Sequence, residues 1–143
     1  MGSAELGVAL FVAHRHLEER AYQAAVSAGA DDITPAQARV LARVGPGGSR
    51  LTDLAAQARV TKQTAGHLVD QLAKAGYVTR TRDPDDGRAR LVQLTAKAHA
   101  LVPAANAEVE RVFEEWREHL GERRMRQLHD SLMLLRELTD PWA

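Results

Sequence analysis

Apolar residues recur at spacings of three and four along the first 28 residues, which is the period of one face of an amphipathic helix. These residues are Leu6, Leu10, Ala13, Leu17, Ala21, Ala24 and Ala25. The repeat predicts a helix over 5–28, and Gly29 is a suitable place for it to end. Thr34 followed by Pro35 is typical of a helix start, so a second, short helix is expected before the glycine-rich run at 45–48.

Two more helices are expected between 51 and 76, joined by a tight connection at 59–60. Thr52 is the expected N-cap of a helix over 53–57, and Thr61 is the expected N-cap of a longer one that ends near Ala75. One face of the longer helix is apolar and is formed by Ala65, Leu68, Val69 and Leu72. The opposite face is polar, so it is left to solvent or to a partner.

The segments 77–82 and 91–94 are β-prone and flank a turn-rich run at 83–87, which predicts a hairpin. Thr95 is the expected cap of a long helix that reaches about His119 and bends at Pro103. The last helix, after Gly121, has an apolar stripe of Met125, Leu128, Leu132, Leu135 and Leu138. The pattern predicts one mainly helical domain over 1–143, with six helices and one small hairpin.

Charge is distributed unevenly along the chain. The whole chain has 19 basic and 19 acidic residues, but 50–97 contains 9 basic and 5 acidic ones, a net charge of +4. The flanking segments then hold a net charge of −4. A basic middle segment favours a polyanionic partner such as nucleic acid, even though the protein is neutral.

The composition and motifs also argue against several functional classes. Cysteine is absent, so disulfides and thiolate metal sites are excluded. The six histidines are scattered, and we expect no metal site and no cofactor. No nucleophile motif or phosphate-binding loop indicates an enzyme. No segment suits a signal peptide or a membrane span, so a cytoplasmic protein without a membrane partner is expected.

The polar face of the helix after Thr61 carries the candidate base-contacting residues. In a helix-turn-helix, the first turn of the second helix enters the major groove of DNA. Gln63 suits adenine, Lys62 suits guanine or a phosphate, and the side chains of Thr64 and His67 can hydrogen-bond either. The alternative is a plain solvated helix face, but the adjoining hairpin with its four arginines favours DNA. Those arginines are Arg80, Arg82, Arg88 and Arg90.

Six short runs of the sequence, taken together, carry a resemblance to a known family. They are LTDLA at 51–55, TKQT at 61–64, LVDQL at 68–72, GYV at 76–78, DPDDGR at 83–88 and LT at 94–95. In this order they resemble the MarR (multiple antibiotic resistance regulator) family of winged helix-turn-helix regulators. The resemblance implies a winged helix-turn-helix over 34–97 and a homodimer formed by helices within 5–28 and 104–139. It also implies a transcriptional regulator, by habit a repressor, that binds a near-palindromic operator and leaves it when a small aromatic or anionic effector binds.

The same resemblance gives the hairpin residues their roles. Arg88 is assigned to the minor groove, where an arginine is favoured by the negative potential, and Asp86 is assigned as the residue that orients it. Gly87 stands where relatives often carry a second arginine, and Arg90 is the candidate to replace its phosphate contact.

Polar residues near the expected effector cleft are weak candidates for ligand contacts. They are His14, Arg15, His16 and Tyr22 on the first helix, and Arg39 and Arg43 on the second. The alternative is that they are ordinary surface residues. A second function also stays open at this point, namely a helical protein–protein interaction module that uses its winged domain without binding specific DNA.

Overall fold

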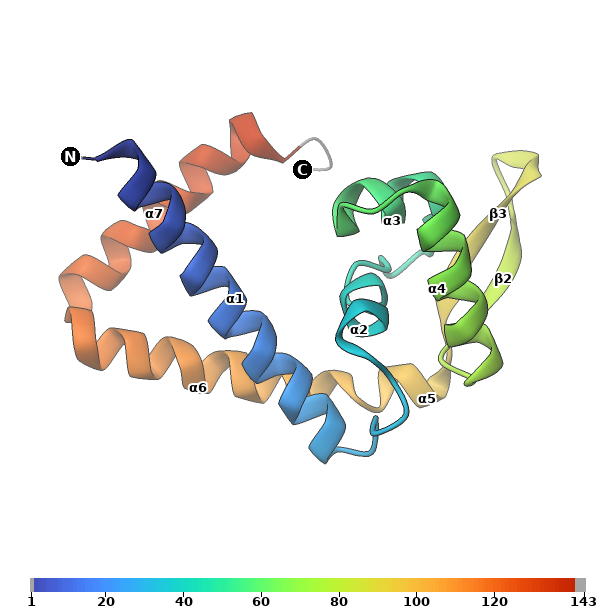
Figure 1. Cartoon of the computed structure of the whole chain (residues 1–143), viewed down its shortest axis with the longest axis horizontal. Helices are drawn as coiled ribbons and strands as arrows, with labels where there is room; N and C mark the ends of the chain where they lie inside the picture. Colours follow the sequence, from blue (N-terminus) through green and yellow to red (C-terminus); the bar gives the residue numbers. More distant parts are fainter. Residues whose placement is uncertain (1, 141–143) are drawn as a thin grey trace.

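Capping and breaking residues set the limits of the first two helices in the computed structural model, which describes residues 2–140 (Figure 1). Helix α1 (Ser3–Ser27) ends two residues before Gly29, whose φ of 121° is in the region that favours glycine. Helix α2 (Pro35–Leu41) begins with a capping box. The Thr34 hydroxyl accepts from the Gln37 backbone N–H at 3.2 Å, and the Gln37 side chain accepts from the Thr34 N–H at 2.9 Å.

Helices α3 (Leu51–Ala58) and α4 (Lys62–Lys74) form the expected helix-turn-helix. Arg59 makes the tight turn between them with a φ of 58°. Thr61 caps α4 as predicted, because its hydroxyl oxygen accepts from the Thr64 N–H at 3.0 Å. The predicted cap at Thr52 is wrong: α3 begins at Leu51, and its N-cap is Arg50, which makes no side-chain cap bond. The chain enters α3 directly from strand β1 (Ser49–Arg50), so the helix has already begun at Leu51 and Thr52 lies inside it.

The sheet has three antiparallel strands in the order β1-β3-β2. They are β1 (Ser49–Arg50), β2 (Val78–Asp83) and β3 (Asp86–Leu94). Strand β3 begins five residues earlier than expected, because Asp83 still pairs with Asp86 after a register shift beside Arg82. The hairpin, called the wing below, therefore has only Pro84 and Asp85 between its strands.

The helix expected from Thr95 to about His119 is divided into α5 (Ala96–His99) and α6 (Val102–Leu120). Pro103 explains the break, because its ring lacks an N–H and would clash with the carbonyl group of His99 in a continuous helix. Thr95 caps α5 as predicted, accepting from the Ala98 N–H at 3.4 Å. Gly121, with a φ of 86°, separates α6 from α7 (Glu122–Thr139).

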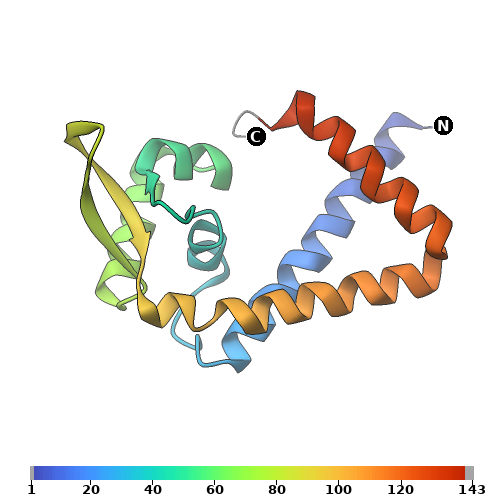
Figure 2. The ribbon, with the colours of Figure 1, turned by 180° about the vertical axis from the view of Figure 1, so that it is seen from behind.

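The buried core lies where α2, α3, α4, α5 and the sheet meet. Its largest fully buried side chains include Val40, Leu54, Val69, Leu72 and Tyr77. Helices α1, α6 and α7 extend away from this core (Figures 1 and 2), and α7 has no buried residue. Large apolar side chains stay exposed on α1 and α7: Leu6, Val8, Leu10, Phe11, Val12, Leu132, Met133, Leu134, Leu135 and Leu138. A single chain thus leaves an extended apolar surface uncovered.

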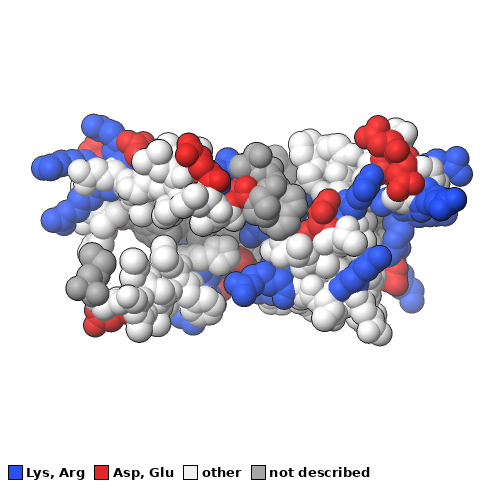
Figure 3. Space-filling model, turned by 90° about the horizontal axis from the view of Figure 1, so that it is seen from above, with Lys and Arg blue, Asp and Glu red and all other residues white. Residues whose placement is uncertain are grey.

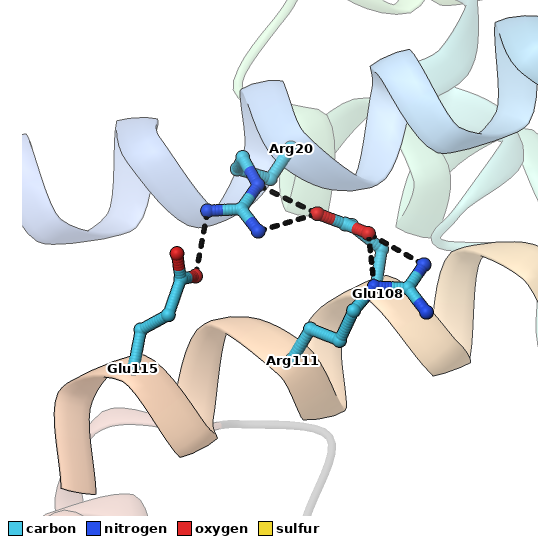
Figure 4. A network of polar contacts seen from close by, with 4 residues as sticks. All are labelled: Arg20, Glu108, Arg111 and Glu115. Atoms are coloured by element: carbon cyan, nitrogen blue, oxygen red, sulfur yellow. Dashed lines mark hydrogen bonds and ion pairs between the residues drawn. The ribbon is translucent and has the colours of Figure 1, made fainter. Parts of the chain in front are cut away.

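A polar network fixes α1 against α6 (Figure 4). The Arg20 guanidinium donates to Glu108 at 2.6 Å and to Glu115 at 2.7 Å, so one side chain of α1 contacts two positions of α6 that are about two turns apart. Arg111 donates to the other oxygen of Glu108 at 2.7 Å. Partly exposed ion pairs of this kind add little to stability, so the main consequence of the network is a polar link between α1 and α6.

Candidate nucleic-acid interface

The two faces of α4 differ as the sequence predicts. Ala65, Leu68, Val69 and Leu72 are buried against the core, whereas Lys62, Gln63, Thr64 and His67 are exposed. The Thr61 hydroxyl donates to the Thr64 hydroxyl oxygen at 2.9 Å while it accepts from the Thr64 N–H. The first turn of α4 is therefore held rigidly, and the Thr64 hydroxyl keeps its own proton for a partner outside the protein.

A groove of about 390 Å³ lies between α4, the start of α3 and the wing. Five cationic residues line it: Arg50, Lys62, Arg80, Arg88 and Arg90. The other lining residues are Leu51, Thr52, Ala89 and Val92, so no carboxylate belongs to the lining. Three of the predicted contact residues thus meet here, while Gln63, Thr64 and His67 lie on the adjoining exposed face of α4. Seen from above, Lys and Arg side chains project from the wing end, beside a group of carboxylates (Figure 3).

An ion pair between Arg50 and Asp83 anchors the wing to the start of α3. The Arg50 Nε and Nη2 atoms lie 2.8 and 2.7 Å from Asp83 Oδ2, and Asp83 is only 4% exposed. Asp83 Oδ1 accepts the backbone N–H of Asp85 at 2.9 Å. The Asp85 N–H and the Arg50 guanidinium together hold the pKa of the Asp83 carboxyl below its usual value. This ion pair could not be predicted from the sequence, because no spacing pattern links positions 50 and 83. Asp83 also lies in a turn-rich run, where an aspartate is expected for the turn alone.

A second ion pair ties the wing to α4. The Nη2 atom of Arg80 lies 2.5 Å from Oδ1 of Asp70, which is on the exposed side of α4. The pair is largely solvated and adds little to stability. Together with the Arg50–Asp83 pair it restricts the orientation of the wing relative to both helices of the helix-turn-helix.

Asp86 contacts Arg88 through the backbone. Its Oδ1 atom accepts the Arg88 N–H at 3.0 Å, whereas the Arg88 side chain is exposed and makes no ion pair within residues 2–140. Asp86 thus shapes the start of β3, and the guanidinium of Arg88 is free to reach a partner. Nothing lies within 4 Å of a Cβ built on Gly87, so this side of the wing is open.

The candidate effector residues do not converge on one cavity. His14 and Arg39 both contact Glu18, at 3.1 and 2.8 Å, and the Tyr22 hydroxyl donates to the Ile33 carbonyl group at 2.7 Å. Arg15 stacks on the Phe11 ring of its own helix, and His16 and Arg43 are exposed. A depression of about 440 Å³ between α1 and α6 is lined by other residues, among them Arg20, Glu108 and Arg111. The effector contacts remain a prediction.

Within 2–140, no group of three or more His, Asp or Glu side chains is arranged to hold a metal ion. No helix in that part of the chain is both long and apolar enough to cross a membrane.

The depressed pKa of Asp83 predicts a pH-dependent contribution to stability. Because the folded protein favours the ionised carboxylate, this contribution is complete above the unfolded pKa of about 3.9 and is lost as the pH falls through the folded pKa. We expect the free energy of unfolding of the parent to exceed that of Asp83→Asn most at neutral pH, with the difference narrowing below about pH 4. Urea unfolding at fixed protein concentration measures both. A difference that stays constant down to pH 2.5 would contradict the assignment.

Comparison with known proteins relates this arrangement to one family. A family model described as "MarR family" matches residues 31–89. The transcriptional regulator FarR of Neisseria gonorrhoeae is 29% identical over 110 residues, which cover 76% of this chain and 75% of that protein. NadR, solved in complex with 4-hydroxyphenylacetate, is 28% identical with a TM-score of 0.70, and the match covers 94% of this chain and 93% of that one. The repressor CouR, solved on a 23-mer DNA duplex, is 28% identical with a TM-score of 0.66 and 91% coverage of both chains.

Proposed function

Because this chain belongs to the MarR family of transcriptional regulators, we propose that it is a dimeric repressor that binds a specific near-palindromic operator and is released by a small-molecule effector. The observation that carries the proposal is the groove between α4 and the wing, which five cations line and no carboxylate does. Because this groove adjoins the polar face of α4, positive charges that can bind phosphates lie beside side chains that can hydrogen-bond to bases. CouR, which shares 28% identity with this chain, is a repressor solved on DNA.

In this proposal, the exposed face of α4 enters the major groove. Gln63 offers a donor and an acceptor to adenine, and Lys62 offers its ammonium group to guanine or to a phosphate. Thr64 has a free hydroxyl proton, and His67 lies one turn further along the same exposed face. The cap at Thr61 supports the proposal, because a rigid first turn loses little conformational freedom on binding.

The wing enters the adjacent minor groove. Arg88 is its contact, since the side chain is exposed at the tip and has no carboxylate partner among the described residues. Asp86 positions it through the Arg88 backbone N–H, and Arg90, five residues after the two-residue turn, contacts a phosphate. The two ion pairs that join the wing to α3 and to α4 support this role, because an oriented wing delivers its arginine at a fixed distance from α4.

The dimer forms through helices within 5–28 and 104–139. Support comes from the exposed apolar residues of α1 and α7, which a stable soluble monomer would not leave uncovered over so long a surface. A two-fold axis through this surface would present two copies of α4 to half-sites about 10 base pairs apart.

The effector is a small aromatic anion. NadR, 28% identical to this chain, was solved with 4-hydroxyphenylacetate, which supports this chemical class. We propose that its polar contacts come from among His14, Arg15 and Tyr22 on α1 and Arg43, which follows α2. Release requires that the effector bind one arrangement of the two DNA-binding units more tightly than the other.

The salt dependence of DNA binding tests the proposal against the alternative of a protein-interaction module. A regulator that neutralises phosphates should lose affinity for a duplex steeply as salt rises, by about a thousand-fold or more between 50 and 200 mM if it makes six contacts. Fluorescence anisotropy with a labelled duplex measures this. Weak binding that does not respond to salt would favour the interaction module.

Gln63→Ala should relax the base preference at one position of each half-site. The expected loss of discrimination there is about 1–3 kcal/mol, because the side chain would lose a bidentate contact to one base. The measurement compares affinities for duplexes that differ at single positions, with the parent as reference. An equal loss on every duplex would instead identify Gln63 as a phosphate contact.

A further inference from the structure

The contacts proposed for α4 and Arg88 do not explain the role of the groove between α4, the start of α3 and the wing. We propose that it holds the phosphodiester strand separating the two DNA grooves, and that Arg50 is a phosphate contact pre-positioned by Asp83. The proposal rests on the proposed function, since it assumes α4 in the major groove and the wing in the minor groove.

The first argument is geometric. Neighbouring major and minor grooves of a duplex are separated by one sugar-phosphate strand. When α4 occupies one groove and the wing occupies the next, this strand must cross the space between α4 and the wing. That space is the groove of about 390 Å³ lined by Arg50, Lys62, Arg80, Arg88 and Arg90.

The second argument is the charge of the lining. Lys62, Arg88 and Arg90 make no ion pair within the described residues, so their charges are available to DNA, and those of Lys62 and Arg90 to its phosphates. Arg80 is engaged by Asp70, an exposed residue outside the groove lining. The lining itself contains five cations and no carboxylate, and the carboxylates that act on Arg50, those of Asp83, Asp86 and Asp53, lie outside it, so the groove favours an anion such as a phosphate.

The third argument concerns how Arg50 is held. Both oxygens of Asp83 are occupied, one by the Asp85 N–H and one by Arg50, and Asp83 is buried. Arg50 donates to it through Nε and Nη2, which leaves Nη1 without a partner among residues 2–140. The Arg50 side chain is 46% exposed and lines the groove. Asp83 therefore fixes the guanidinium from inside while its outer edge stays open to an acceptor.

The position of Arg50 in the chain supports a dedicated role. It is the N-cap of α3, where Ser, Thr, Asp or Asn would cap the helix through a side-chain oxygen. Helix α3 has no such side-chain cap. The residue instead connects the start of α3 to the wing, at the point where the strand must cross.

The experiment compares the salt dependence of binding to one labelled duplex that the parent protein binds. The variants are Arg50→Ala, Asp83→Asn and the double variant Arg50→Ala/Asp83→Asn, with Arg123→Ala as a matched control. Arg123 is exposed in the first turn of α7 and is not one of the apolar residues that the dimer is proposed to cover. The start of α7 lies far from the wing (Figure 1). The mass and circular dichroism of each variant establish that it is folded and in the parental oligomeric state.

We expect the slope of log affinity against log salt to decrease by about 0.9 for each Arg50 that contacts DNA. Arg50→Ala and the double variant should show the same decrease, since the slope follows the phosphate contact. Asp83→Asn and Arg123→Ala should keep the parental slope, even where Asp83→Asn lowers affinity by loosening the wing. The proposal is overturned if all variants show equal slopes and Arg50→Ala and Asp83→Asn lower the affinity alike. The Arg50–Asp83 pair would then have only a structural role. If the parent itself binds no duplex, the proposed function fails first.

Discussion

Arg88→Ala is expected to weaken operator binding by about 1–3 kcal/mol for each half-site, while the protein stays folded and dimeric. The guanidinium is exposed at the wing, lines the basic groove and has no carboxylate partner among the described residues. Removal of the guanidinium should therefore change the stability of the folded protein little, whereas the complex loses one contact to DNA. Fluorescence anisotropy on an operator duplex measures the affinity, and light scattering measures the mass.

Arg123→Ala is the matched control for this prediction. It removes the same charge from the first turn of α7, away from the wing, and should leave operator affinity near that of the parent. The assignment of the wing is wrong if Arg88→Ala binds as tightly as the parent. It is also wrong if both variants lose affinity equally, because the loss would then follow net charge alone.

Leu135→Asp is expected to dissociate the dimer and, with it, to abolish tight operator binding. Leu135 is 49% exposed in the single chain and belongs to the apolar stripe of α7. If a second chain covers this stripe, the substitution buries an unpaired carboxylate at the interface, which costs several kcal/mol. Light scattering should show the mass fall from about twice 15.7 kDa to 15.7 kDa.

Arg126→Asp provides the comparison on the same helix. Arg126 lies nine residues before Leu135 and so on the opposite side of α7, where an aspartate stays in solvent. This variant should remain dimeric. A Leu135→Asp protein that keeps the parental mass would show that the α7 stripe is not the dimer contact.

The helices could be predicted where a local sequence pattern determines their ends and their buried faces. Thr34, Thr61 and Thr95 each cap a helix as expected, because the cap depends on residues three positions away. The two faces of α4 followed from the helical period. The mainly helical winged helix-turn-helix could therefore be predicted from short-range signals alone.

Features that depend on distant residues could not be predicted. Strand β1 has two residues, too few for a pattern, and forms because Ser49 and Arg50 pair with Val92 and Leu91. The Arg50–Asp83 pair joins residues 33 positions apart, so nothing in either local segment indicates it. The cap at Thr52 failed for the same reason, since the strand pairing moved the start of α3.

The candidate site was predicted in part. Lys62, Arg88 and Arg90 were identified from helix position and resemblance, and they meet at one groove. Arg50 and Arg80 complete its lining, but their proximity depends on the way the sheet folds against α3 and α4. Asp86 was expected to orient Arg88, and it contacts the backbone N–H of Arg88, a detail that the local sequence does not determine.

Selection from a pool of random duplex DNA tests the central claim, that α4 and the wing recognise a specific operator, most directly. The account predicts enrichment of a near-palindrome whose half-sites lie about 10 base pairs apart. Each half-site should combine fixed bases opposite α4 with a neighbouring minor-groove segment at the wing. A pool that shows no enriched sequence after repeated rounds, although the protein is folded and dimeric, would contradict it.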